Sequence, residues 1–123
     1  MIEANRRKPA GGEYWFAEGC YITELSNSEV DPEVSIARAR VCPGDVTRWH
    51  SLKDTTERYV ILEGMGEAEI GDATPRRVLP GDVVLIKPGE RQRIRNLGRE
   101  DLVFLAICSP RFEQENYQDL QGG

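Results

Sequence analysis

The feature that most constrains the fold is a regular alternation between short β-prone segments and turns that contain Gly or Pro. Residues 57–62 (ERYVIL) and 102–108 (LVFLAIC) are rich in side chains that favour strands, and the triplets Pro43-Gly44-Asp45 and Pro80-Gly81-Asp82 are typical turns. The turns recur about every ten residues, a spacing that is typical of antiparallel sandwiches and barrels. The pattern predicts an all-β fold of about seven or eight short strands.

The length of 123 residues fits a single domain with one core. We expect residues 1–18, which are polar and contain Gly and Pro, to form an N-terminal arm or an edge strand, and residues 19–110 to form the barrel. For residues 111–123 we predict a short C-terminal helix and a tail. Ser109 followed by Pro110 is typical of a helix start, and the charges of Glu113 and Glu115 suit the first turn of a helix.

Charge and hydropathy exclude several classes of protein. The net charge is −5, whereas nucleic-acid-binding proteins more often carry a basic excess, so we expect no nucleic-acid partner. No apolar run reaches the roughly 18 residues of a membrane span, so we expect no membrane insertion. The early positive charges are not followed by the apolar stretch of a secretion signal, and we therefore expect a cytoplasmic location.

The counts of cysteine and histidine limit the sites that the chain can form. The three cysteines are an odd number without CxxC spacing, which argues against both a disulfide framework and a thiolate zinc site. His50 is the only histidine. A three-histidine metal site, or a facial triad with two histidines, is therefore excluded within this chain.

Three side chains that can coordinate a metal lie on predicted strands from which they can converge. Successive residues of a strand alternate between its faces, so Tyr59 shares a face with Glu57, and Arg48 shares one with His50. If these faces and the face of Gln92 point inward, His50, Glu57 and Gln92 meet in the mouth of the barrel. Their nitrogen and oxygen atoms can hold one divalent zinc, nickel, iron or manganese ion and leave positions open for water or substrate. The alternative is a buried hydrogen-bond cluster without a metal.

The spacing of these residues resembles the two motifs of the cupin superfamily. Residues 44–64 resemble the first motif, in which Gly is followed by His-x-His, Glu and Gly, and residues 81–96 resemble the second, which runs Gly, Pro, Gly, His and Asn. The resemblance implies a jelly-roll barrel, also called a double-stranded β-helix. His50 and Glu57 match ligands of the first motif, whereas Leu52 and Gln92 stand where the motifs have histidine.

Two functions remain open. The first is an enzyme that binds a small polar metabolite, which can be anionic, beside the metal and uses Glu57 or a metal-bound hydroxide to move a proton. Isomerases, epimerases, cyclases and lyases are the enzymes that the resemblance to small cupins implies. Tyr59 is then a proton donor or part of the pocket wall, although core packing explains it as well, and Arg48 is a candidate for binding an anionic substrate. The second function is a non-catalytic module that binds or senses a small ligand and has a degenerate metal site.

The arm contains three consecutive aromatic residues, Tyr14, Trp15 and Phe16. Such a run seldom stays exposed. Small cupins commonly dimerise through an edge strand or an N-terminal arm, so the resemblance implies that this arm takes part in an exchange between chains. We therefore predict a homodimer.

Overall fold

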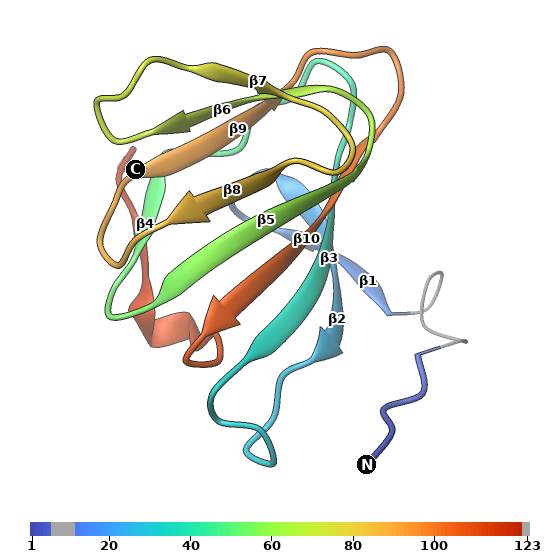
Figure 1. Cartoon of the computed structure of the whole chain (residues 1–123), viewed down its shortest axis with the longest axis vertical. Helices are drawn as coiled ribbons and strands as arrows, with labels where there is room; N and C mark the ends of the chain where they lie inside the picture. Colours follow the sequence, from blue (N-terminus) through green and yellow to red (C-terminus); the bar gives the residue numbers. More distant parts are fainter. Residues whose placement is uncertain (6–11, 122–123) are drawn as a thin grey trace.

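The computed structural model describes residues 1–5 and 12–121, and its strands form two antiparallel sheets that face each other (Figure 1). The larger sheet has the order β1-β2-β3-β10-β5-β8, and the smaller has the order β11-β4-β9-β6-β7. This architecture confirms the predicted all-β jelly roll. Residues 6–11 of the predicted arm and 122–123 of the predicted tail lie outside the described residues. The strands are β1 (Glu13–Phe16), β2 (Cys20–Ser26), β3 (Ser35–Val41), β4 (His50–Leu52), β5 (Thr56–Glu63), β6 (Gly66–Ile70), β7 (Arg76–Val78), β8 (Val83–Ile86), β9 (Gln92–Asn96), β10 (Leu102–Ser109) and β11 (Tyr117–Asp119).

The core lies between the two sheets and is built by the alternation of side chains along each strand. On β5, Tyr59 and Ile61 face inward and are buried, whereas Val60 and Leu62 between and after them are more exposed. β5 pairs with β10, whose Phe104 packs against Tyr59 with 4.4 Å between the ring centroids. The same alternation carries polar side chains of β4, β5 and β9 into the interior. The most deeply buried aliphatic side chains come from both sheets and include Val41, Ile61, Ile86, Ile94 and Leu102.

The turn between β5 and β6 has a strict requirement for glycine at position 64. Gly64 has a φ of +86°, and a Cβ added there would lie 2.6 Å from the carbonyl oxygen of Asp101. The contact is with backbone, so no side-chain rotation can relieve it. Glycine is therefore needed both for the left-handed conformation and for the close approach of the two chain segments.

The predicted C-terminal helix is wrong. Residues 111–121 contain only a three-residue 3-10 turn (Gln114–Asn116) as helical structure, after which β11 pairs antiparallel with β4 and places Tyr117 opposite Leu52. The hydroxyl group of Ser51 also donates a hydrogen bond to the side-chain oxygen of Gln118 at 3.2 Å. A short exposed helix has little stability of its own, whereas the edge of β4 offers backbone hydrogen bonds. The paired strand therefore prevails over the local helix signals.

The N-terminal aromatic residues have partners within the chain. β1 is the edge strand of the larger sheet and pairs with β2. The ring of Phe16 contacts Phe112 and Tyr117 edge-on, and the ring of Trp15 contacts Tyr21 in the same way. Tyr14 and Trp15 nevertheless stay 46% and 55% exposed, and the homodimer stays a prediction.

The described residues include no helix that is long and apolar enough to cross a membrane.

Candidate functional site

The three side chains that the strand pattern and motifs single out lie together inside the barrel. His50 begins β4, Glu57 lies near the start of β5, and Gln92 begins β9. His50 stands directly opposite Gln92 in the pairing of β4 with β9, and the Gln92 amide nitrogen donates a hydrogen bond to Glu57 Oε1 at 2.9 Å. All three residues are buried, with 8% exposure for Glu57 and less for the other two.

Glu57, Gln92 and Tyr59 form a continuous chain of hydrogen bonds. The hydroxyl group of Tyr59 donates to the side-chain oxygen of Gln92, whose amide nitrogen donates to Glu57. The thiol group of Cys108 lies 3.6 Å from Glu57 Oε2. Both ends of the Gln92 amide have partners, with the nitrogen toward Glu57 and the oxygen toward Tyr59.

Glu18 completes the site and was not among the predicted residues. It lies between β1 and β2, and its Oε2 is 3.0 Å from Nε2 of His50. The backbone N–H of Arg48 donates to the carbonyl oxygen of Glu18 at 2.6 Å, which holds this turn beside the start of β4. On the sequence Glu18 is one glutamate in a polar arm, and no motif or spacing distinguishes it.

Both nitrogen atoms of the His50 ring face oxygen acceptors. Nδ1 lies 2.7 Å from the carbonyl oxygen of Arg48, and Nε2 faces Glu18, so the ring can donate from both nitrogen atoms as an imidazolium. The ring of Tyr117 stacks on His50 with 5.2 Å between centroids. The Tyr117 hydroxyl is buried and has no hydrogen-bond partner among the described residues. A buried hydroxyl of this kind is a group that a bound water or ligand can satisfy.

The surroundings shift the pKa values of His50 and Glu57. Burial is the largest single influence and acts to lower the pKa of His50, but the carboxylate of Glu18, the Arg48 carbonyl and the charge of Glu57 together raise this pKa to about 9. Burial raises the pKa of Glu57 to about 7, and the negative charge of Glu18 acts in the same direction. Near neutral pH, His50 is therefore charged and Glu57 exchanges between its acid and carboxylate forms.

A small cavity of about 50 Å³ lies beside Glu57 and Glu18. This volume holds a few water molecules or the reacting part of a small substrate. Three carboxyl groups border it, and among residues 1–5 and 12–121 no lysine or arginine lines it. The cavity therefore favours a neutral or positively charged group. Its lining consists of Tyr14, Phe16, Glu18, Ile22, Glu24, Ser35, Ala37, Glu57, Ala106, Cys108 and Phe112.

The side chain of Arg48 lies outside this cavity. Its guanidinium forms an ion pair with Asp119 on β11, with 3.1 Å between Nη2 and Oδ2, and the side chain is one-third exposed. Arg48 is not among the lining residues of the cavity. Its predicted role in binding an anionic substrate stays a prediction.

The donor arrangement does not fit a divalent metal held by His50, Glu57 and Gln92. Nε2 of His50 faces Glu18, and the amide oxygen of Gln92 is directed to the hydroxyl of Tyr59 and not toward His50 or Glu57. Gln92 presents its N–H, not its oxygen, toward Glu57. Within the described residues, no three His, Cys, Asp or Glu side chains are grouped so that they could hold one ion.

Comparison with known families decides the identity of the barrel. The family model of the cupin domain matches residues 37–108, from β3 to near the end of β10. The chain is a cupin. The matched region contains His50, Glu57 and Gln92, whereas Glu18 lies before it.

Two curated relatives carry the same name. This cupin is 32% identical over 95 residues to glucose-6-phosphate isomerase of Pyrococcus abyssi, a match that takes in 68% of this chain and 50% of that protein. Glucose-6-phosphate isomerase of Pyrococcus furiosus is 30% identical over 95 residues, with the same coverage. The chain spans about half the length of the curated relatives it matches.

Solved structures share the fold of this cupin at low sequence identity. Oxalate decarboxylase from Bacillus subtilis has a TM-score of 0.78 and 19% identity, covering 90% of this chain and 30% of that one. A protein of Thermotoga maritima, described as a predicted oxalate decarboxylase, has a TM-score of 0.77 and 23% identity, covering 89% of this chain and 99% of that one. These likenesses show the fold alone.

Proposed function

We propose that this cupin is an isomerase-type enzyme that moves a proton on a small polar metabolite and uses Glu57 as the base. The observation that carries the proposal is the position of Glu57, a buried carboxyl group that borders a cavity while Gln92 holds one of its oxygen atoms. The names of the two curated relatives support this reaction class. Epimerases, cyclases and lyases use the same elementary step of proton transfer.

The residues of the site have separate roles in this proposal. Glu57 takes a proton from a substrate carbon or hydroxyl group and returns it, a task that suits a carboxyl group with a pKa near 7. Tyr59 does not border the cavity and acts through Gln92, so we assign it a positioning role. The imidazolium of His50 offsets the negative charge of Glu18 beside the reacting group.

An assay of solvent proton exchange tests the reaction class. Glucose 6-phosphate and unphosphorylated glucose are incubated in deuterium oxide, and NMR detects deuterium at carbon 2 and formation of the ketose. We expect exchange with one of these sugars, a rate that rises about tenfold per pH unit and levels off above about pH 7, and a loss of at least about 100-fold in Glu57→Gln. Glu24→Gln, which alters a carboxyl group on the same cavity, is the matched control. Exchange that survives in Glu57→Gln would overturn the proposal.

Whether the protein binds the predicted divalent metal is a separate question within this proposal. Elemental analysis of the purified protein measures it directly. About one zinc, nickel, iron or manganese ion per chain, lost in His50→Ala, would support a metal-dependent enzyme. It would also require the Glu18–His50 pair to open. No metal after reconstitution with each of the four ions would end the metal prediction.

One observation favours the alternative of a non-catalytic ligand-binding module. His50, Glu57, Gln92 and Tyr59 all have hydrogen-bond or ion-pair partners within the chain, as in a cluster whose role is to stabilise the barrel. A protein that binds a sugar without proton exchange, and binds it equally well as Glu57→Gln, would favour this alternative over the enzyme.

A further inference from the structure

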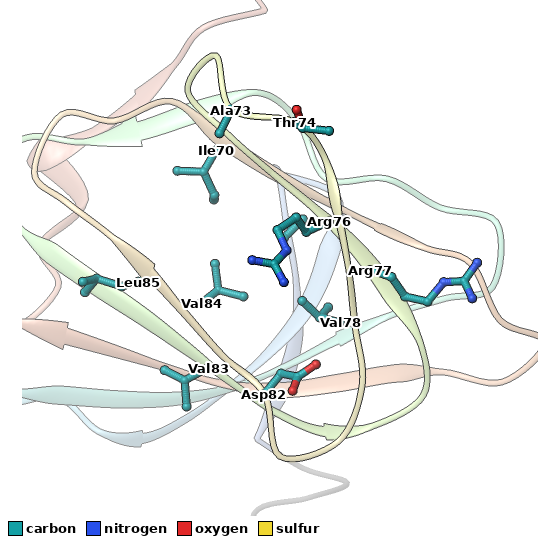
Figure 2. Close-up of a pocket in the computed structure, with 11 residues that line it drawn as sticks. Ile70, Ala73, Thr74, Arg76, Arg77, Val78, Asp82, Val83, Val84 and Leu85 are labelled. Atoms are coloured by element: carbon teal, nitrogen blue, oxygen red, sulfur yellow. The ribbon is translucent and has the colours of Figure 1, made fainter.

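A second and larger cleft opens between the edges of the two sheets (Figure 2). Its volume is about 400 Å³, within the range of small-molecule sites. None of His50, Glu57 and Gln92 lines it, so it is distinct from the cavity beside Glu57. Its lining consists of Ala68, Ile70, Ala73, Thr74, Arg76, Arg77, Val78, Asp82, Val83, Val84 and Leu85.

The cleft is bordered by two strands that each end a sheet. β7 is the last strand of the smaller sheet, and β8 is the last strand of the larger sheet. The backbone N–H of Ile61 donates to the carbonyl oxygen of Asp82. In an antiparallel pair every second residue is hydrogen-bonded to the partner strand, so Val84 and Ile86 are the residues of β8 that bond to β5. The backbone N–H groups of Val83 and Leu85 therefore point away from β5, toward the free edge.

Two neighbouring arginines on β7 point in opposite directions. The side chain of Arg76 extends into the cleft, whereas that of Arg77 extends away from it (Figure 2). Within residues 1–5 and 12–121, the Arg76 guanidinium has no hydrogen-bond or ion-pair partner. Thr74, two residues earlier, also lines the cleft and has a hydroxyl group. This end of the cleft therefore presents donors for an anion.

Apart from Arg77, whose side chain extends away, the rest of the described lining is apolar except for one carboxylate. Ile70 and Val84 pack against the core, and Val78 belongs to it. Asp82 lies at the far end of β7, where its carboxylate accepts the backbone N–H of Leu79 at 2.8 Å. Its negative charge disfavours an anion at that end. A ligand should therefore place its charge near Arg76 and its apolar part over the aliphatic side chains.

We propose that the cleft between β7 and β8 is a second ligand site of this cupin, and that it binds a small carboxylate with a short apolar chain. The carboxylate accepts hydrogen bonds from Arg76 and Thr74, and the apolar chain covers Ile70, Val78 and Val84. The proposal does not rest on the reaction proposed for Glu57.

A titration followed by NMR tests the site with hexanoate as the probe. Backbone amide signals are recorded for the wild type, for Arg76→Gln and for Arg77→Gln as hexanoate is added. We expect saturable shifts at residues of β7 and β8 with a dissociation constant of about 1 mM or lower. Arg76→Gln should weaken binding at least about tenfold, because it removes a charge-assisted pair. Arg77→Gln, with the same change in net charge, should bind as the wild type does.

Two further probes separate the parts of the ligand. Acetate lacks the apolar chain and hexanol lacks the charge, so both should bind more weakly than hexanoate, and hexanol should not distinguish the two variants. Equal weakening in Arg76→Gln and Arg77→Gln would show a general charge effect and overturn the proposal. The absence of saturable shifts in the wild type would overturn it as well. Shifts of the β8 amide signals with protein concentration alone, and none with hexanoate, would identify the edge as a self-association surface instead.

Discussion

The substitution Glu18→Gln should change the charge of His50 at neutral pH. The pKa of His50 is about 9, against an ordinary value of 6.5, and the carboxylate of Glu18 is the largest influence that favours the charged form. One pKa unit is worth about 1.4 kcal/mol, so the site stabilises the imidazolium by about 3 kcal/mol. Without this carboxylate, burial acts against the charge, and we expect the pKa of His50 to fall to 6.5 or below.

The composition of the chain makes this measurement unambiguous. His50 is the only histidine, so the ring signals of histidine in an NMR spectrum report on this residue alone. Titration of the wild type from about pH 5 to about pH 10 should give a midpoint near 9, and Glu18→Gln should move it by at least about 2.5 units. Glu24→Gln is the control, because Glu24 borders the same cavity but is not among the groups that shift the pKa of His50.

Two results would refute the reasoning. A wild-type midpoint near 6.5 would show that the Glu18–His50 pair does not form in solution. An equal change in Glu18→Gln and Glu24→Gln would show that the pKa of His50 responds to the total negative charge around the cavity and not to one ion pair at 3.0 Å.

Three further predictions address stability and assembly. Gly64→Ala should lower the free energy of unfolding by about 2–5 kcal/mol, and Gly44→Ala by only about 1–2 kcal/mol. Both glycines have a positive φ, but only at position 64 would the added Cβ clash with backbone. Equal losses in urea denaturation would contradict this prediction. The free energy of unfolding should fall as the pH rises from about 5 to about 9. The folded-state pKa values of Glu57 and His50 lie above their ordinary values. The stability that Glu57 contributes is therefore complete below about pH 4.5 and is lost as the pH rises through about 7. The stability that His50 contributes is complete below about pH 6.5 and is lost as the pH rises through about 9. Urea titrations at several pH values that show a constant or rising free energy would argue against these shifts. Light scattering should give twice the mass of one chain, whereas the mass of a single chain would refute the homodimer.

Most of the barrel could be predicted because its signals are local. Gly and Pro mark the turns, and apolar residues mark the strands, so the expected segments at residues 57–62 and 102–108 fall within β5 and β10. The C-terminal segment could not be predicted in this way. Ser109, Pro110 and two glutamates fit a helix locally, but the free edge of β4, about 65 residues earlier in the chain, provides a partner for β11. Local preference does not report such a distant partner.

The residues of the site also differ in whether local sequence signals could predict them. His50, Glu57 and Gln92 could be selected because strand alternation and two motifs fix their positions on three inward faces. Glu18 could not be selected, because its place beside His50 depends on how the turn between β1 and β2 folds against the start of β4. The prediction treated Gln92 as a metal ligand or as a member of a buried hydrogen-bond cluster with His50 and Glu57, and did not name Tyr59 as its partner. Its hydrogen bond with Tyr59 depends on the packing of β5 against β9, which the motif spacing does not report.

The departures from the cupin motifs have a common consequence for the charge of the interior. Leu52 is buried and stands opposite Tyr117 in the pairing of β4 with β11, so an apolar side chain lies where the motif has a histidine. Gln92 is an amide that donates to Glu57 without carrying a charge. The proton on His50 therefore supplies the positive charge that faces Glu18. Because His50 keeps that proton up to about pH 9, a side chain of the protein itself offsets the negative charge of the cluster. The substitution Glu18→Gln tests this charge balance directly.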